Sequence, residues 1–282
     1  YETELNGMKG LGQSQQWLHL QPGKTYEWNV AAGEHVTVRV MPEFRRYVLF
    51  EGTGAKGTFT VQFNMPFARF EVYSDGPISY ISLKPADHFH NCRRDVLDAI
   101  KEMHPKTIRL PGGIFAEKTD WKDGLKPIEE RHPIDHDGKA ILFCCHENYD
   151  SHELNIDDYA AICDYVGAEM EVTVRLTFCD LQDAADLVEY CNGDVSTPMG
   201  ALRALNGHPE PYNVRYWEMD NETFRWFSWE EYAHTVVRYA RAMKAVDPGV
   251  QIGLCSYHYF RLHVEDMLAI CGEDVDFLAD RV

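Results

Sequence analysis

The chain has 282 residues, enough for one large domain or two smaller ones. Its 27 basic and 45 acidic side chains give a formal net charge of −18, which argues against nucleic acid and anionic membranes as partners. No apolar run approaches the roughly 20 residues that cross a bilayer, and no signal peptide is visible. This composition is compatible with a globular protein that acts on a neutral or weakly basic small molecule.

The eight cysteines form no CxxC pair and have no regular spacing. Four of them fall within apolar helix or strand patterns, as buried free thiols do. These four are Cys163, Cys191, Cys255 and Cys271. Such cysteine usage favours a reducing compartment, so we expect a cytoplasmic protein, with secretion as the alternative.

From about residue 24 to residue 84, apolar and polar residues alternate. In segment 36–40, for example, three valines share one face and two polar residues share the other. Turn signals rich in Pro and Gly separate the alternating runs. Several short strands at this spacing are typical of an antiparallel β-sandwich. We therefore predict a sandwich domain over residues 1–84.

After Pro85 the period changes, and strands alternate with helices. The expected strands lie near residues 108, 174, 217, 253 and 277, and the expected helices cover 95–103, 157–166, 181–191, 228–246 and 263–271. This order predicts parallel βα units in an α/β fold. A closed barrel needs eight strands, so residues 85–282 are interpreted as a partial TIM-type (β/α)8 barrel. A doubly wound open sheet is the alternative, but no Gly-rich phosphate turn leads into a helix.

The segment 214–222 reads as a strand that ends in Asn221 and Glu222. In barrels of alternating strands and helices, that end of a strand is where the chemistry takes place. A glutamate there can protonate a leaving-group oxygen, and an asparagine can hold a substrate hydroxyl. The plainer interpretation is a solvated glutamate beside a turn-forming asparagine. As an isolated dipeptide, the pair carries little weight.

Longer motifs accompany this pair along the chain. They are Ile108-Arg109-Leu110-Pro111-Gly112-Gly113-Ile114-Phe115, Trp121-Lys122-Asp123-Gly124, Cys163-Asp164-Tyr165-Val166-Gly167, Glu189-Tyr190-Cys191-Asn192-Gly193, Asn206-Gly207-His208-Pro209-Glu210-Pro211-Tyr212 and Tyr216-Trp217-Glu218-x-x-Asn221-Glu222. Together they resemble glycoside hydrolase family 51, the α-L-arabinofuranosidases, over residues 82–255. The first 80 residues resemble, more weakly and through segments 12–14 and 17–26, a family-4-like carbohydrate-binding module found in some members.

The resemblance implies a retaining exo-glycosidase that releases terminal furanose or related sugars from plant polysaccharide side chains, with no cofactor and no metal. It implies Glu222 as the acid/base, Asn221 as the partner of the sugar 2-hydroxyl, and Arg109 beside the nucleophile. The candidate substrate-binding residues are Trp121, Phe115 and His258. An oligosaccharide or polysaccharide is the expected partner.

Other interpretations stay open for some of these residues. Arg109 could instead form a structural ion pair. Trp121 is flanked by charged residues in an expected loop and could simply pack that loop instead of stacking on a sugar. Glu218 shares strand parity with Glu222, and we expect it to be a buried, hydrogen-bonded structural residue rather than a catalyst.

The family layout also bears on completeness. Its acid/base lies on the fourth barrel strand and its nucleophile on the seventh, whereas Glu222 ends the third strand visible here. The resemblance therefore implies one strand before residue 1, two strands after residue 282, and a nucleophile outside this chain. We expect the barrel to be completed by a homo-oligomer, a complementary chain or a further segment of the same chain.

Three departures from the family pattern put arabinose specificity in doubt. Ile114 stands where the family usually has Asn and some members have Cys, and Asp220 stands where it usually has Gly. The last expected strand ends in Ala279-Asp280-Arg281, without an expected His-Tyr pair. A non-catalytic carbohydrate-binding or structural relative is therefore the alternative function.

Two His/Cys groups raise the question of a metal site. They are His88, His90 and Cys92, and Cys144, Cys145 and His146. Neither group has the two spaced pairs of ligands that a structural zinc site requires. The sequence therefore predicts no metal.

Overall fold

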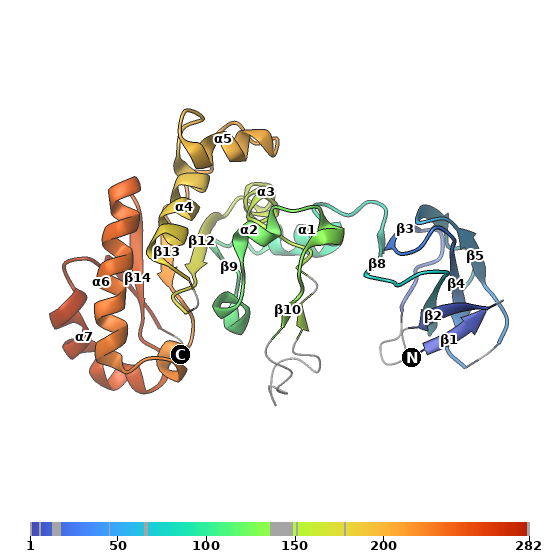
Figure 1. Cartoon of the computed structure of the whole chain (residues 1–282), viewed down its shortest axis with the longest axis horizontal. Helices are drawn as coiled ribbons and strands as arrows, with labels where there is room; N and C mark the ends of the chain where they lie inside the picture. The colour runs from blue at the N-terminus through green and yellow to red at the C-terminus, as the bar shows by residue number, and fades with distance from the viewer. Residues whose placement is uncertain are drawn as a thin grey trace. The chain divides into compact units, whose positions relative to one another are not determined.

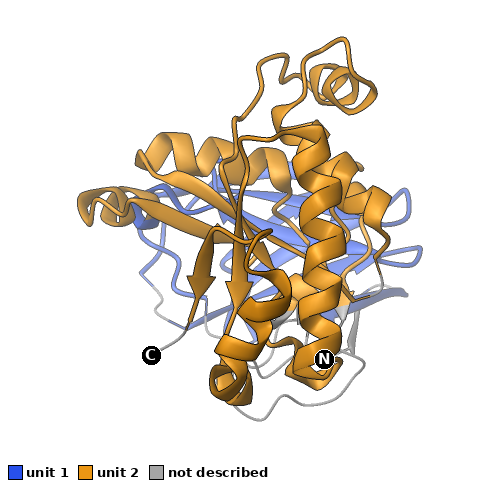
Figure 2. Ribbon diagram, turned by 90° about the vertical axis from the view of Figure 1, so that its left-hand side faces the viewer, with its two compact units in different colours: residues 1–96 blue, residues 97–282 orange. Residues whose placement is uncertain are grey.

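The computed structural model describes residues 2–5, 7–12, 18–44, 46–64, 67–135, 149–150, 152–177 and 179–280. The chain divides into two compact units, residues 1–96 and residues 97–282 (Figure 2). The two units are described separately below.

Unit 1 is an antiparallel β-sandwich. Its strands are β1 (Glu2–Leu5), β2 (Met8–Gly12), β3 (Thr25–Ala31), β4 (Val36–Pro42), β5 (Phe50–Thr53), β6 (Lys56–Thr60), β7 (Ala68–Ser74) and β8 (Tyr80–Pro85). They form a five-stranded sheet in the order β1-β2-β7-β4-β5 and a three-stranded sheet in the order β6-β3-β8. Side chains from both sheets, including Trp28 and Val38, form one core.

The alternation in the sequence arises from this core. Val36, Val38 and Val40 of β4 are buried, while the residues between them are half-buried. The prediction of antiparallel strands is confirmed. Strands β1 and β2 were not anticipated as elements, because runs of four and five residues carry little period-2 signal. That this sandwich is a carbohydrate-binding module stays a prediction.

Unit 2 contains a parallel sheet with helical connections (Figure 1). Its elements are α1 (Arg94–Glu102), β9 (Thr107–Leu110), η1 (Gly113–Glu117), α2 (Trp121–Gly124), η2 (Ile128–Glu130), β10 (Ile134–Asp135), β11 (Tyr149–Asp150), α3 (Ile156–Val166), β12 (Glu169–Val174), α4 (Leu181–Asn192), α5 (Pro198–Leu205), β13 (Tyr216–Met219), η3 (Thr223–Arg225), α6 (Trp229–Val246), β14 (Gln251–Cys255), η4 (His258–His263), α7 (Val264–Cys271) and β15 (Phe277–Ala279). The prediction of parallel βα units is confirmed.

The five strands lie in the order β15-β14-β13-β12-β9, and every neighbouring pair is parallel. The order follows the sequence without reversal, as in a singly wound barrel, whereas a doubly wound sheet reverses at a switch point. Helix α6 packs against both α4 and α7. The core contains Val172, Trp217 and Ile252 from the strands and Val236 from α6.

Local signals set several boundaries as expected. Helix α6 begins with a capping box, in which Ser228 and Glu231 satisfy each other's backbone amides. Helix α3 ends at Gly167, whose φ of 83° would strain a residue with a side chain. The four cysteines expected to be buried free thiols are so. Within the described ranges, no helix is both long and apolar enough to cross a membrane.

Other boundaries differ from the prediction. Strand β13 ends at Met219, three residues before Glu222, whereas the sequence predicted a strand reaching Glu222. The segment from residue 258 to residue 263 is a 3-10 helix, so α7 begins at Val264. Helix α5 and the small β10-β11 hairpin were not anticipated.

Candidate active site

The end of β13 carries the predicted acid/base residue. Strand β13 stops because Asp220 has a φ of 63°, in the left-handed region, which interrupts extended backbone. The Asp220 amide still donates to the carbonyl of Val174 on β12, at 2.9 Å. Glu222 therefore lies just past the carboxyl end of a parallel strand, which is the position expected of a barrel catalyst.

The Glu222 side chain is only 15% exposed and has a charged neighbour. Nη2 of Arg225 donates to its Oε2 at 3.0 Å. The two residues belong to the same turn, because Glu222 precedes η3 and Arg225 ends it. Arg225, which was not singled out in the sequence, therefore fixes the position of the candidate acid/base beside the end of β13.

Arg109, on β9, lies beside this tip. Its Nε donates to Oε2 of the buried Glu218, and its Nη2 donates to Oδ1 of Asn221 at 3.2 Å. The structural ion pair weighed for Arg109 therefore exists, and so does a contact with a predicted site residue. Glu171 on β12 lies opposite Arg109 of β9 and Tyr216 of β13 in the strand register. Burial raises the pKa of Glu171, the charge of Glu218 adds to this, and Arg109 opposes it.

Asp220 is fully buried, so it does not line a substrate site as an extra carboxylate would. Its Oδ2 accepts from the amides of Leu176 at 2.7 Å and Thr177 at 3.3 Å, and its Oδ1 accepts from the amide of Asn221 at 2.7 Å. Burial raises the pKa of Asp220 to about 6; the amide hydrogen bonds oppose the rise and the charge of Glu117 adds to it.

Glu117 is a second buried carboxyl that the sequence did not single out. It is 2% exposed, and its Oε2 accepts from the indole N–H of Trp226 at 2.9 Å. Its Oε1 is buried with no hydrogen-bond partner in the described part of the chain. The only available signal was its position two residues after the motif that ends in Phe115. The contact with Trp226 spans 109 residues, which local patterns do not reveal.

The three predicted substrate-binding residues lie in different surroundings. His258 is exposed, and its ring stacks on Phe224, two residues after Glu222, at 4.6 Å between centroids. Phe115 is half-buried in η1, the element that also carries Glu117. The structure therefore brings His258 to the segment beside Glu222.

Trp121 departs from the prediction. It does not lie in a loop but opens the short helix α2, because Asp120 caps that helix by accepting from the amides of Lys122 and Asp123. The indole is 8% exposed and packs against Tyr190 at 5.4 Å. A buried ring offers little surface for stacking on a sugar, so the packing interpretation holds.

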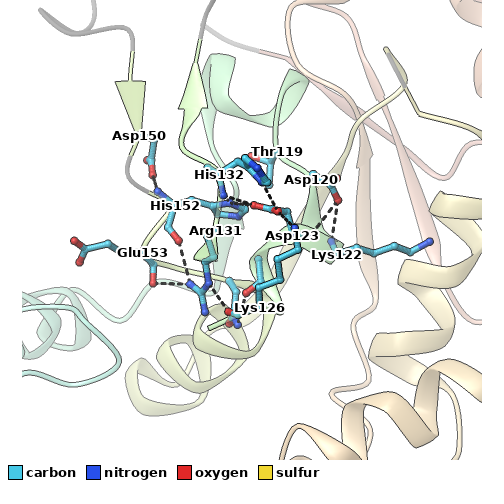
Figure 3. Close-up of polar contacts among 12 residues, drawn as sticks. Thr119, Asp120, Lys122, Asp123, Lys126, Arg131, His132, Asp150, His152 and Glu153 are labelled. Carbon is cyan, nitrogen blue, oxygen red and sulfur yellow. Dashed lines mark hydrogen bonds and ion pairs between the residues drawn. The ribbon is translucent and has the colours of Figure 1, made fainter. Parts of the chain in front are cut away.

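Asp123, in the same motif, is the centre of a polar cluster (Figure 3). Its carboxylate accepts from Nζ of Lys126, and it accepts from both Nδ1 and the amide of His132 at 2.8 and 2.6 Å. Burial alone would raise the pKa of Asp123, but the hydrogen bonds from Lys126 and His132 outweigh it and lower the pKa well below its ordinary value. The guanidinium of Arg131 donates to the carbonyls of His152 and Glu153. This motif therefore fixes loops rather than contacting the strand-end site.

No metal centre appears in the described ranges. Among those residues, no group of three His, Cys, Asp or Glu side chains is placed to hold an ion. His88 instead contacts Glu27, with 2.9 Å between Nε2 and Oε1. The second group, Cys144, Cys145 and His146, lies outside the described residues, as do residues 13–17, which carry part of the resemblance to a binding module.

The fold and the site together define a class. A singly wound parallel sheet with polar residues at the carboxyl ends of its strands has the layout of a (β/α)8-barrel enzyme. Residues 99–267 match the family model of the α-L-arabinofuranosidase 1 domain. The chain belongs to the α-L-arabinofuranosidases of glycoside hydrolase family 51.

Individual relatives support the assignment. The chain is 32% identical over 191 residues to α-L-arabinofuranosidase C of Emericella nidulans, a match that covers 63% of this chain and 36% of that protein. A family 51 α-L-arabinofuranosidase from Bifidobacterium longum superimposes with a TM-score of 0.62 at 30% identity, over 70% of this chain and 40% of that one. The α-L-arabinofuranosidase of Thermotoga maritima, solved in an arabinose complex, gives a TM-score of 0.59 at 28% identity, over 68% and 39%.

These matches confirm a partial (β/α)8 barrel. The matched segment amounts to roughly a third of the Emericella relative. What the whole protein does is therefore treated below as a proposal.

Proposed function

We propose that this chain supplies the acid/base half of a retaining exo-acting arabinofuranosidase. The observation that carries the proposal is the position of Asn221 and Glu222 just past a parallel strand, next to Arg109. Retaining glycosidases use two carboxyl groups roughly 5 Å apart, one of which protonates the leaving oxygen and then deprotonates water. Glu222 takes that role here, and the nucleophile lies outside this chain.

The neighbouring residues support a sugar in this position. Because Arg109 donates to Oδ1 of Asn221, the orientation of the amide is fixed. Asn221 is fully buried in the described chain, so its proposed donation from Nδ2 to the sugar 2-hydroxyl requires the tip to open when substrate binds. His258 and Phe115 are the proposed substrate-binding residues on the flanking elements η4 and η1. The arabinose complex of the Thermotoga relative supports a furanose as the ligand. Trp121 is omitted because its ring is buried.

One observation favours a non-catalytic relative instead. Nη2 of Arg225 lies 3.0 Å from Oε2 of Glu222, so a neighbouring side chain already occupies an oxygen that a general acid must offer to the leaving group. The alternative is therefore a carbohydrate-binding or structural protein with a preserved fold. It predicts sugar binding by calorimetry without hydrolysis.

Replacing Glu222 by Ala in the full-length protein separates the two. We expect hydrolysis of alkyl arabinofuranosides, which have poor leaving groups, to fall about 10²- to 10⁴-fold. Aryl glycosides of acidic phenols should lose much less, because their departure needs little protonation. Azide should partly rescue the variant and give a product with retained configuration. The matched control is Glu230→Ala, which removes an exposed carboxylate on α6.

Three results would count against the assignment. Equal impairment of Glu222→Ala on all leaving groups, without azide rescue, would remove Glu222 from the acid/base role. Equal impairment of Glu230→Ala would point to a general loss of fold. A wild-type protein that binds arabinose but hydrolyses nothing would establish the non-catalytic alternative.

We also propose that the barrel is completed by chain outside residues 1–282, from the same protein, a second copy or a complementary subunit. In the described sheet, β9 and β15 each have one strand neighbour, and five parallel strands do not close a barrel. Light scattering of the isolated chain tests this proposal. A monodisperse, folded monomer that is as active as the full-length protein would contradict the need for further chain.

We propose a reducing, cytoplasmic compartment for this protein. The buried free thiols Cys163, Cys191 and Cys271 support it.

A further inference from the structure

The backbone just before Asn221 and Glu222 has an unusual combination of features. Asp220 is in the left-handed region with a φ of 63°, is fully buried, and directs its carboxylate at backbone amides. Glycine adopts this conformation freely, and the resemblance to family 51 places glycine at this position. Asp tolerates left-handed backbone better than most residues, but it introduces a charge into the interior.

The hydrogen bonds that the Asp220 carboxylate accepts from the segment after β12 offset part of the cost of burying its charge. Strand β12 ends at Val174, so the amides of Leu176 and Thr177 lie beyond the β-ladder. Oδ2 of Asp220 accepts from both, at 2.7 and 3.3 Å. Buried amides that lack an acceptor are destabilising, so this side chain joins the end of β12 to the end of β13.

Ionisable groups surround Asp220 on three elements. Glu117 faces it from η1, Tyr232 from α6, and Glu218 lies on its own strand. Glu117 also shares a neighbour with Asp220, because the hydroxyl of Thr177 reaches the Glu117 carbonyl at 3.5 Å while the Thr177 amide reaches Asp220. The backbone of Glu117 and the carboxylate of Asp220 thus both contact Thr177, in the segment after β12.

We propose that Asp220 is a positioning residue: its buried carboxylate ties the Asn221-Glu222 tip to the amides that follow β12, and Glu117 sets the electrostatic environment in which that tie forms. The tie itself stands independently of the proposed glycosidase activity. Only the kinetic consequence for Glu222 rests on that function. Because the pKa of Asp220 is raised to about 6, the tie changes from a charged to a neutral acceptor as the pH falls through that value.

Amide hydrogen exchange in the full-length protein tests the tie directly. In Asp220→Gly, which keeps the left-handed backbone but loses the carboxylate, we expect protection of the Leu176 and Thr177 amides to fall at least tenfold. The control is Asn213→Gly, which also places glycine at a left-handed position but at an exposed site before β13, and it should leave the protection of those amides unchanged. Unchanged protection in Asp220→Gly would overturn the proposal.

A second variant guards against misfolding of the first. Glu117→Gln keeps an oxygen acceptor for Trp226 but removes the charge that faces Asp220. In the wild type, protection of Leu176 and Thr177 should change with a midpoint near pH 6, and in Glu117→Gln that midpoint should move to lower pH. An unmoved midpoint would overturn the part of the proposal that concerns Glu117.

The kinetic measurement depends on the proposed function. If the wild type hydrolyses arabinofuranosides, Asp220→Gly should lower kcat at least tenfold with little change in KM, because the tip is displaced rather than the sugar site removed. The acidic limb of the kcat–pH profile of Asp220→Gly should also shift relative to that of the wild type. If Asp220→Gly has the same kcat and the same pH profile of kcat as the wild type, the tie does not position Glu222. If the wild type is inactive, the glycosidase proposal fails, while exchange at Leu176 and Thr177 still decides whether the tie exists.

Discussion

Two buried aspartates in unit 2 behave in opposite ways. Asp123 receives hydrogen bonds from Lys126 and His132, and its pKa is lowered. Asp220 accepts hydrogen bonds from the backbone amides of Leu176 and Asn221, and its pKa is raised. Burial acts on both carboxyls in the same direction. Asp220 is also the more deeply buried of the two, so its amides offset the cost of burial only in part, whereas Lys126 helps to offset a smaller cost at Asp123.

Arg109 and Glu218 provide the largest test of this comparison. Arg109→Ala would remove a cation from the buried Glu218, and we expect it to lower the free energy of unfolding by about 3 kcal/mol. Urea denaturation at pH 7 measures this. Adding Glu218→Gln to the same chain should recover part of the loss, because the uncompensated charge is gone. A loss below about 1 kcal/mol would mean that solvent already screens Glu218.

Asp123→Asn should have a smaller effect, a loss of about 2 kcal/mol at neutral pH from its hydrogen bonds to Lys126 and His132. The folded pKa is depressed, so this stabilisation is complete above the ordinary value of 3.8 and is lost as pH falls below it. Because the folded pKa of Asp123 is far below 3.8, most of the difference between the two proteins should remain at pH 3. Thermal unfolding of both proteins from pH 1 to pH 7 would show the curves converging only at the acidic end of this range. A difference that stays constant down to pH 1 would contradict the ionic explanation.

Glu231 tests the role of burial with the smallest expected change. Its carboxylate, like that of Asp220, accepts from a backbone amide, here that of Ser228, but it is exposed to solvent and its pKa is lowered by that amide and by the Ser228 hydroxyl. Carbon-detected NMR of Ser228→Ala should therefore show the pKa of Glu231 moving up towards its ordinary value. Ser196→Ala, at an exposed loop position, is a suitable control. No movement would indicate that the capping box does not form in solution.

The sequence predicted those parts of the molecule that are specified locally. The valines of β4, the cap at Ser228 and the glycine after α3 are read directly from neighbouring residues. The strand carrying Glu222 was also found, but not its end, because the left-handed turn at Asp220 depends on amides from another strand. An aspartate at that position gives no sign of it in a single sequence.

Contacts between distant residues account for what could not be predicted. The ion pair of Arg109 with Glu218 and the contact of Glu117 with Trp226 each span 109 residues. The Tyr190 ring that buries Trp121 comes from α4, so charged neighbours of Trp121 in the sequence wrongly indicated an exposed loop. Patterns within a window of a few residues carry no information on such pairs.

The strand order of unit 2 has a consequence for how the sheet assembles. Since each strand pairs with the next strand in the chain, every new pair closes a loop no longer than one connection. The longest of these connections runs from Leu110 to Glu169, between β9 and β12. Loop-closure entropy therefore opposes this pairing most, and β9 is the strand that joins the growing sheet at the greatest cost. Arg109 is on β9, so its contact with Asn221 depends on this least local pairing.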